Sequence, residues 1–348
     1  MPRIDAFLEI GRQQGGSDIH FAVGLPPLVR LDAELVPIPY RELNENECHD
    51  LVRELMNDEH WETCKKNGAV DLSYESEAAG RFRINAFHRR GGLSAVCRII
   101  PEQVPSMAEL GLPRVLSQFG KLSNGLVLVT GSTGTGKSTT LAAMIREINE
   151  RESLNILTLE DPIEFVHQAK RCQIVQREVG THVRSFSDGL RAALRADPDV
   201  ILVGELRDPD TVMLALEAAE TGHLVFGTLH TSSAAKTVDR IVDVFPAAEK
   251  EMVRSMLSES LIGVISQTLC KTKDGTGRVA AHEIMIGTPA IRNLIRENKI
   301  AQMYSMMQTS SGLGMQTLDQ CLSDLIKRSV INYSDARAIA KNPDAFMG

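Results

Sequence analysis

The sequence has few aromatic residues and no excess of basic ones. Phe, Trp and Tyr together make up 4% of its 348 residues, and the formal net charge is −7. Proteins that bind single-stranded nucleic acid usually combine a basic groove with stacking aromatic side chains. We therefore expect no nucleic acid among the partners of this protein.

Long apolar runs are also missing. No uninterrupted apolar run approaches the about 18 residues that a membrane span requires. The first residues include Asp5 and Glu9, where a signal peptide would need an apolar core. Hydrophobic residues make up 43% and charged residues 24%, which is ordinary for a soluble globular protein. These features predict a cytoplasmic protein.

Cysteine is scarce, and no two cysteines form a C-x-x-C pair. This spacing excludes a familiar zinc site or disulfide framework and favours reduced, buried thiols. The sequence also contains no low-complexity tract and no internal repeat. The six cysteines are Cys48, Cys64, Cys97, Cys172, Cys270 and Cys321.

The length is sufficient for about two domains of ordinary size. Residues 1–100 alternate short strand-like runs with helical stretches, which predicts a small α+β domain with helices on one face of a sheet. Residues 101–120 change in character, with Pro101, Pro105 and Pro113 around a short helical piece, and we interpret them as a linker.

From residue 121 onward, apolar runs alternate with helical segments, as in "LVLVT", "NILTLE", "VILVG" and "LVFGTLH". Such runs are typical of a parallel sheet covered on both faces. Residues 121–348 are therefore predicted to form a doubly wound α/β domain. Its last hundred residues are expected to be mainly helical, with residues 246–269 as the longest amphipathic helix.

A phosphate-binding loop follows the first of these runs. Residues 131–138, "GSTGTGKS", match the pattern G-x-x-x-x-G-K-[ST] between a strand and a helix. Glycines allow backbone N–H groups to surround a phosphate, and the lysine adds positive charge. The alternative, a structural glycine turn, does not explain the lysine and serine. The residues expected to contact the nucleotide are Ser132, Thr133, Gly134, Thr135, Gly136, Lys137, Ser138 and Thr139.

Acidic residues follow two other predicted strands. Glu205 ends "VILVGE", as in a Walker B segment, where a carboxylate can bind Mg²⁺ or polarise water. Glu160, Asp161 and Glu164 follow "NILTL". This second cluster suits metal and water positioning, although a solvated turn would have the same composition. The predicted metal ligands are Ser138, Glu160 and Glu205.

Histidine and arginine complete the candidate catalytic residues. His230 follows the strand "LVFGTL" and either senses the terminal phosphate or is a hydrogen-bonded core residue. Arg81 and Arg83 are two residues apart in a predicted strand and so share one face, which is either solvated or supplies guanidinium groups to a nucleotide. Arg195 and Arg207, on either side of the Walker B strand, are further candidates.

Together these segments resemble the type II/IV secretion ATPase superfamily over nearly the whole chain. "EDPIEF", "ILVGELRD" and "GHLVFGTLHT" are similar to its Asp box, Walker B segment and His box. "AIRNLIRE", residues 290–297, resembles the C-terminal signature of its type IV pilus retraction members. The same eight residues also fit an ordinary short amphipathic helix, so only the family resemblance points to retraction.

The resemblance implies a PAS-like N-terminal domain, a RecA-like P-loop ATPase domain with a helical C-terminal region, and a homohexameric ring that uses ATP and Mg²⁺. It implies that Glu164 activates water, although the residues leave the choice between Glu164 and Glu205 open. It further implies that Arg81 and Arg83 act on a nucleotide. The resemblance places the ring at the inner face of the cytoplasmic membrane, bound to the pilus platform protein. Through that protein the ring would act indirectly on pilin subunits, and a retraction paralogue is a possible further partner.

Three alternatives remain at this point. A pilus assembly or type II secretion ATPase would share these motifs, but such proteins often carry a four-cysteine zinc insert and an extra N-terminal region. A RecA-like nucleic-acid translocase would need the basic, aromatic channel whose composition is lacking. A nucleotide-gated binding protein with negligible turnover would not need acidic and histidine segments around the phosphate loop.

Overall fold

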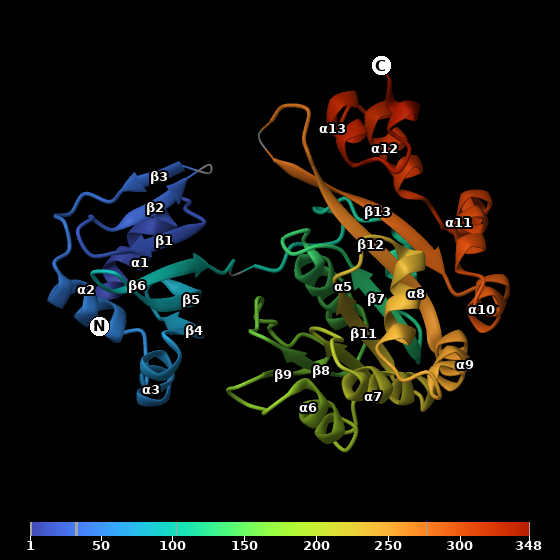
Figure 1. The fold of residues 1–348 in the computed structure, drawn as a ribbon, viewed down its shortest axis with the longest axis horizontal. Coiled ribbons are helices and arrows are strands. Elements are labelled where there is room, and N and C mark those ends of the chain that lie inside the picture. The colour runs from blue at the N-terminus through green and yellow to red at the C-terminus, as the bar shows by residue number, and fades with distance from the viewer. Residues whose placement is uncertain (1, 32–33, 102, 276, 348) are drawn as a thin grey trace. The chain divides into compact units, whose positions relative to one another are not determined.

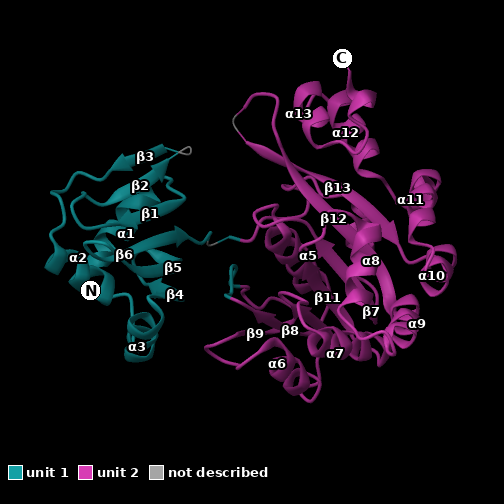
Figure 2. Cartoon of the chain, viewed as in Figure 1, with its two compact units in different colours: residues 1–103, 162–166 teal, residues 104–161, 167–348 magenta. Residues whose placement is uncertain are grey.

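The computed structural model describes residues 2–31, 34–101, 103–275 and 277–347. The chain divides into two compact units (Figure 2). The first contains residues 1–103 together with residues 162–166, and the second contains residues 104–161 and 167–348. A short segment that follows β8 (Asn155–Glu160) in the sequence therefore belongs to the first unit.

The first unit is an antiparallel sheet in the strand order β3-β2-β1-β6-β5-β4, with helices on one face (Figure 1). Ile4, Leu8 and Leu51 of these helices are buried in a core shared with the sheet. The elements are α1 (Arg3–Gln13), β1 (Asp18–Phe21), β2 (Leu28–Leu31), β3 (Glu34–Pro37), α2 (Glu45–Arg53), α3 (Asp58–Asn67), β4 (Ala69–Ser76), β5 (Gly80–Arg89) and β6 (Gly92–Ile99).

The second unit contains a seven-stranded sheet in the order β13-β12-β7-β11-β10-β8-β9. Its strands are parallel except β13, which is antiparallel to β12. The strands are β7 (Gly125–Thr130), β8 (Asn155–Glu160), β9 (Gln173–Glu178), β10 (Val200–Val203), β11 (Leu224–Leu229), β12 (Leu261–Lys271) and β13 (Arg278–Ile286).

Alternate residues of the central strands enter two different cores, because successive side chains point to opposite faces of a sheet. Leu126 and Leu128 belong to the core that includes residues of α6–α11, whereas Val127 and Val129 belong to the core that includes residues of α4 and α5. The helices are α4 (Arg114–Phe119), α5 (Lys137–Arg151), α6 (Phe186–Ala193), α7 (Pro209–Glu220), α8 (Ala234–Asp243), α9 (Lys250–Ser260), α10 (Pro289–Arg296) and α11 (Ile300–Thr309).

The C-terminal residues form a further small core on the β12–β13 hairpin. Leu322 and Ala336 pack there with Cys270 and Ala281 of the two strands. The elements are α12 (Leu318–Lys327), α13 (Tyr333–Ile339) and two 3₁₀ turns, Ser311–Leu313 and Pro343–Phe346. Among the helices of the described residues, none has both the length and the apolarity needed to cross a membrane.

The predicted helix over residues 246–269 is wrong in its second half. A helix, α9, ends at Ser260, and strand β12 begins at Leu261. The segment after Ser260 is apolar on both faces and rich in β-branched residues, which favours a buried strand. Gly263 also allows close packing, since a Cβ there would lie 2.9 Å from the Phe119 ring. The last hundred residues therefore contain two long strands besides their helices.

Candidate functional site

Four loops of the second unit meet at one edge of its sheet. They follow the carboxyl ends of β7, β11, β10 and β8, which are neighbouring parallel strands. Backbone hydrogen bonds link the loops in pairs: Gly131 N donates to Leu229 O (3.4 Å), and Gly204 N donates to Leu159 O (2.7 Å). This edge is where open α/β sheets bind their ligands. The predicted phosphate loop, His230, Glu205 and Glu160 are thus brought to one place.

The loop after β7 has the backbone geometry of a phosphate cradle. Gly134 and Gly136 have φ angles of 79° and 86°, which side chains with a Cβ rarely adopt. Helix α5 begins at Lys137, so its positive end points to the loop. The Lys137 ammonium donates to the carbonyl oxygens of Gly131 (2.9 Å) and Ser132 (3.0 Å). The loop therefore combines glycines of positive φ, the N-terminus of a helix and the Lys137 ammonium, the features expected of a phosphate-binding loop.

Glu205 lies two residues beyond the end of β10 and contacts two basic side chains. Arg207 Nε donates to its carboxylate, and His230 Nε2 lies 3.1 Å from its Oε1 atom. The Glu205 side chain is 16% exposed and that of His230 is 41% exposed. Burial raises the pKa of Glu205, but the Arg207 hydrogen bond and the His230 and Arg207 charges outweigh it. The net pKa is lowered, so the carboxylate is charged at neutral pH.

The acidic cluster after β8 is divided between the two units. Glu160, the last residue of β8, accepts hydrogen bonds from Thr158 Oγ1 (2.6 Å) and Gln176 Nε2 (3.1 Å). Glu164 belongs to the segment that packs with the first unit, where its Oε1 atom lies 3.8 Å from Arg83 Nη1. The two carboxylates therefore have different surroundings, which the sequence spacing does not show.

Arg81 and Arg83 share one face of β5, since they alternate with the buried residues Phe82 and Ile84. Arg81 Nη1 is 3.9 Å from Glu75 Oε2 on the neighbouring strand. Arg195 has a different position: it is exposed and precedes β10, whereas Glu205 follows that strand. Arg195 thus lies at the opposite end of β10 from Glu205 and does not join the loops of its own chain.

Gln267, in β12, is a buried residue of this region that sequence reasoning missed. Its side chain is 5% exposed, and its Nε2 atom donates to Thr135 O in the phosphate loop (2.6 Å). Its Oε1 atom accepts from Thr140 Oγ1 in the first turns of α5 (2.8 Å). One amide group thus ties the loop and the helix to the neighbouring strand. Three consecutive polar residues, Ser266 to Thr268, interrupt the apolar strand, but the segment was predicted to be a helix and Gln267 was not singled out.

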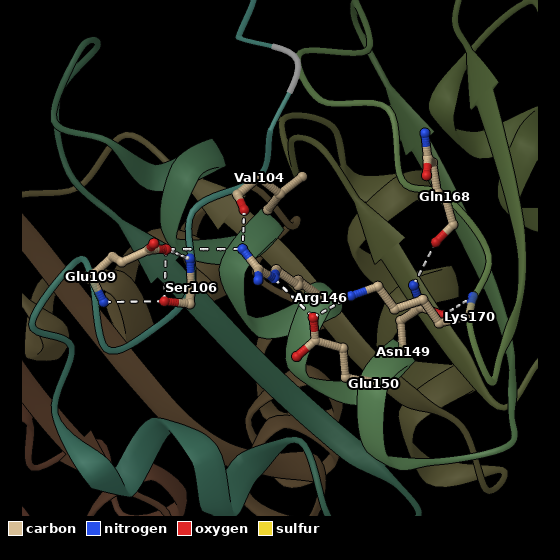
Figure 3. Close-up of polar contacts among 8 residues, drawn as sticks. All are labelled: Val104, Ser106, Glu109, Arg146, Asn149, Glu150, Gln168 and Lys170. Carbon is tan, nitrogen blue, oxygen red and sulfur yellow. Dashed lines mark hydrogen bonds and ion pairs between the residues drawn. The ribbon is translucent and has the colours of Figure 1, made fainter.

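The outer side of α5 carries a second polar network (Figure 3). Arg146 donates to Val104 O (2.5 Å) and to Glu150 (3.0 Å), while Asn149 donates to Gln168 O (2.8 Å). Lys170 also pairs with Glu150 at 2.5 Å. The helix that begins at the phosphate loop therefore also holds the segment leading out of the first unit and the segment following residue 166.

No group of three or more His, Cys, Asp and Glu side chains in the described part of the chain is placed to bind a metal ion on its own. This absence does not conflict with Mg²⁺, because Mg²⁺ in nucleotide sites is bound through one or two carboxylates together with phosphates and water. The charged Glu205 carboxylate provides a ligand of that kind, and Ser138 at the start of α5 provides a hydroxyl oxygen.

Comparison with known proteins identifies the family. A model of the family described as Type II/IV secretion system protein matches residues 4–327. The chain belongs to this family. It is 56% identical to the type IV pilus retraction ATPase PilT of Pseudomonas aeruginosa over 99% of each chain. It is also 56% identical to a twitching motility protein of Neisseria gonorrhoeae over 92% of this chain and 85% of that protein.

A crystal structure of the pilus retraction motor PilT with bound ADP superposes with a TM-score of 0.92, at 45% identity over 99% of this chain and 98% of that one. The predicted fold class is confirmed: an N-terminal α+β domain precedes a RecA-like ATPase domain. The family resemblance inferred from the motifs is confirmed as well, and the two relatives compared are retraction and twitching proteins.

Proposed function

We propose that this protein is an ATP-hydrolysing motor that retracts type IV pili and thereby drives twitching motility. The observation that carries the proposal is the match to the retraction ATPase PilT over 99% of both chains. A match of this extent covers both predicted domains and the phosphate loop, Walker B and histidine segments together. The edge of the second sheet supplies the chemistry that such a motor needs.

In the proposed reaction, backbone N–H groups of residues 132–139 and the Lys137 ammonium hold the β- and γ-phosphates of ATP. Ser138, Glu160 and Glu205 would hold Mg²⁺, which would supply positive charge to neutralise the charge that develops on the phosphates. We assign the polarisation of the attacking water to Glu205 rather than Glu164. The Glu205 carboxylate is charged and contacts His230, whereas the Glu164 carboxylate faces Arg83 in the first unit.

His230 has a distinct place in this proposal. Its imidazole is exposed on one side and contacts Glu205 on the other. It can therefore hydrogen-bond a terminal phosphate while holding the carboxylate that acts on water. Arg81, Arg83, Arg195 and Arg207 are candidates for stabilising the charge on the transferred phosphate, three of them from outside the four loops.

The proposed working form is a homohexameric ring with nucleotide between subunits. It would act at the inner face of the cytoplasmic membrane on the pilus platform protein and, through it, on pilin subunits, with or without a retraction paralogue. Hydrolysis around the ring would move the platform so that pilins leave the fibre. Nothing in this arrangement requires nucleic acid.

Phosphate release by the purified protein tests the enzymatic part of the proposal and separates it from a nucleic-acid translocase and from a binding protein without turnover. We expect steady ATP hydrolysis that stops when EDTA removes Mg²⁺. Adding single-stranded DNA should leave the hydrolysis rate unchanged. Stimulation by DNA that falls steeply with salt would instead indicate a translocase. Nucleotide binding with no turnover would indicate a nucleotide-gated binding protein.

A further inference from the structure

Glu283, in β13, is a buried carboxylate held by two groups. It is 2% exposed, and its Oε1 atom accepts from the backbone N–H of Ala234 (2.8 Å). Its Oε2 atom forms an ion pair with Lys341. A buried charge is costly unless it is paired and hydrogen-bonded, so removing either partner leaves it poorly compensated.

Ala234 is the first residue of α8, and only residues 230–233 separate it from the end of β11. His230 is therefore in a short loop with one end fixed by the central sheet and the other by Glu283. A carboxylate at a helix N-terminus also interacts favourably with the helix dipole. Thr231 Oγ1, 2.6 Å from Thr237 Oγ1, adds a contact between the loop and α8.

Lys341 is itself held in place. Asp319, at the start of α12, accepts hydrogen bonds from the backbone N–H groups of Lys341 (2.8 Å) and Asn342 (3.0 Å). The Lys341 ammonium also lies 4.6 Å from the centre of the Tyr304 ring, a cation–π contact. The C-terminal segment thus presents one ammonium group to the carboxylate beneath α8.

We propose that Glu283 and Lys341 are positioning residues for His230, so that the C-terminal segment sets the geometry of the catalytic loop. Lys341 compensates the Glu283 charge, Glu283 fixes the N-terminus of α8, and α8 fixes the loop that aims His230 at Glu205. This inference rests on the proposed function, because it assigns His230 to the hydrolytic site. It adds that Glu283 and Lys341, which are distant from His230 in the sequence, determine the geometry of that site.

The test compares Lys341→Met with the double variant Lys341→Met/Glu283→Gln. Lys341→Met leaves a buried carboxylate without its cation, and a displaced loop lowers kcat by about 10- to 100-fold. The KM for ATP should change much less, because the phosphate loop is untouched. Amide hydrogen exchange of residues 231–236 should quicken. The double variant removes the uncompensated charge and should regain much of the lost kcat.

Three controls keep the result specific. Lys327→Met removes a lysine from the wall of the same 1070 Å³ cavity that Lys341 lines, and should leave kcat unchanged. Lys341→Arg keeps the positive charge and should keep most of the activity. It therefore still tests the role of the charge if Lys341→Met does not fold. Gel filtration shows whether each variant assembles like the wild type.

Wild-type kcat and wild-type exchange in Lys341→Met would overturn the inference. So would equal losses of kcat, nucleotide binding and thermal stability that the double variant does not recover, because these indicate a general structural role. The proposed function fails separately, through the absence of ATP turnover in the wild-type protein. A dead Glu205→Gln together with a fully active Lys341→Met would reject only the positioning role.

Discussion

Replacing Glu205 with Gln is expected to lower ATP turnover by about 10²- to 10⁴-fold, the range for losing a positioned acid or base. The substitution keeps the size of the side chain and removes its charge. Because the pKa of Glu205 is lowered by Arg207 and His230, the wild-type group is a carboxylate at neutral pH, and the loss reflects that charge. Nucleotide binding should change little.

Two further variants distinguish nucleotide binding from water activation. Lys137→Ala should lose nucleotide binding as well as turnover, because it removes the cation of the phosphate loop. Glu164→Gln should retain more turnover than Glu205→Gln if Glu205 polarises the water. Phosphate release and binding of a fluorescent ATP analogue measure the two quantities. Glu217→Gln, on the exposed side of α7, is the matched control.

Turnover close to wild type in Glu205→Gln would reject the assignment of the site. A loss that is larger in Glu164→Gln than in Glu205→Gln would instead transfer the water-activating role to Glu164. Thermal unfolding of each variant distinguishes a chemical defect from misfolding.

Mixing two inactive variants is expected to restore activity if an arginine of one subunit completes the site of another. Arg81→Ala keeps Glu205, and Glu205→Gln keeps Arg81. In a ring with heterologous interfaces, random mixing at equal amounts places both intact groups at about one site in four. Arginines supplied by a neighbouring subunit increase the rate about 10³- to 10⁵-fold. The hydrolysis rate of the mixture should therefore clearly exceed that of either variant alone, even with about one site in four intact.

The same experiment with Arg83→Ala separates the two arginines. Arg83 is 3.8 Å from Glu164 in its own chain, so its loss also changes the surroundings of that carboxylate. The measurement is phosphate release after co-refolding or subunit exchange, with each variant alone as the baseline. Absence of any recovery with both arginine variants would contradict a role in a neighbour's site.

Local sequence signals predicted the parts of the site that depend on local structure. The phosphate loop requires glycines, Lys137 and Ser138 within eight residues, and the structure starts α5 at Lys137 as expected. Glu205 and His230 could be placed because each follows an apolar strand, and the ends of parallel strands meet at one edge. The alternation of β5 likewise placed Arg81 and Arg83 on one face.

The parts that escaped prediction depend on contacts between distant segments. Gln267 reaches Thr135 and Glu283 reaches Ala234, across 132 and 49 residues of sequence. No local pattern marks such pairs, and both residues lie on strands of the hairpin at residues 261–286. The first strand of that hairpin was predicted to be a helix, since a short apolar run fits a buried helix and a buried strand equally well.

The central claim, that hydrolysis by this protein retracts pili, is tested most directly by counting pili and scoring twitching. The test strain carries Glu205→Gln in place of the wild-type protein, with a wild-type copy restored as the control. We expect abundant surface pili, no retraction of labelled fibres and no twitching, because assembly continues while removal of pilins stops. A strain with a bald surface would contradict the account and indicate an assembly ATPase.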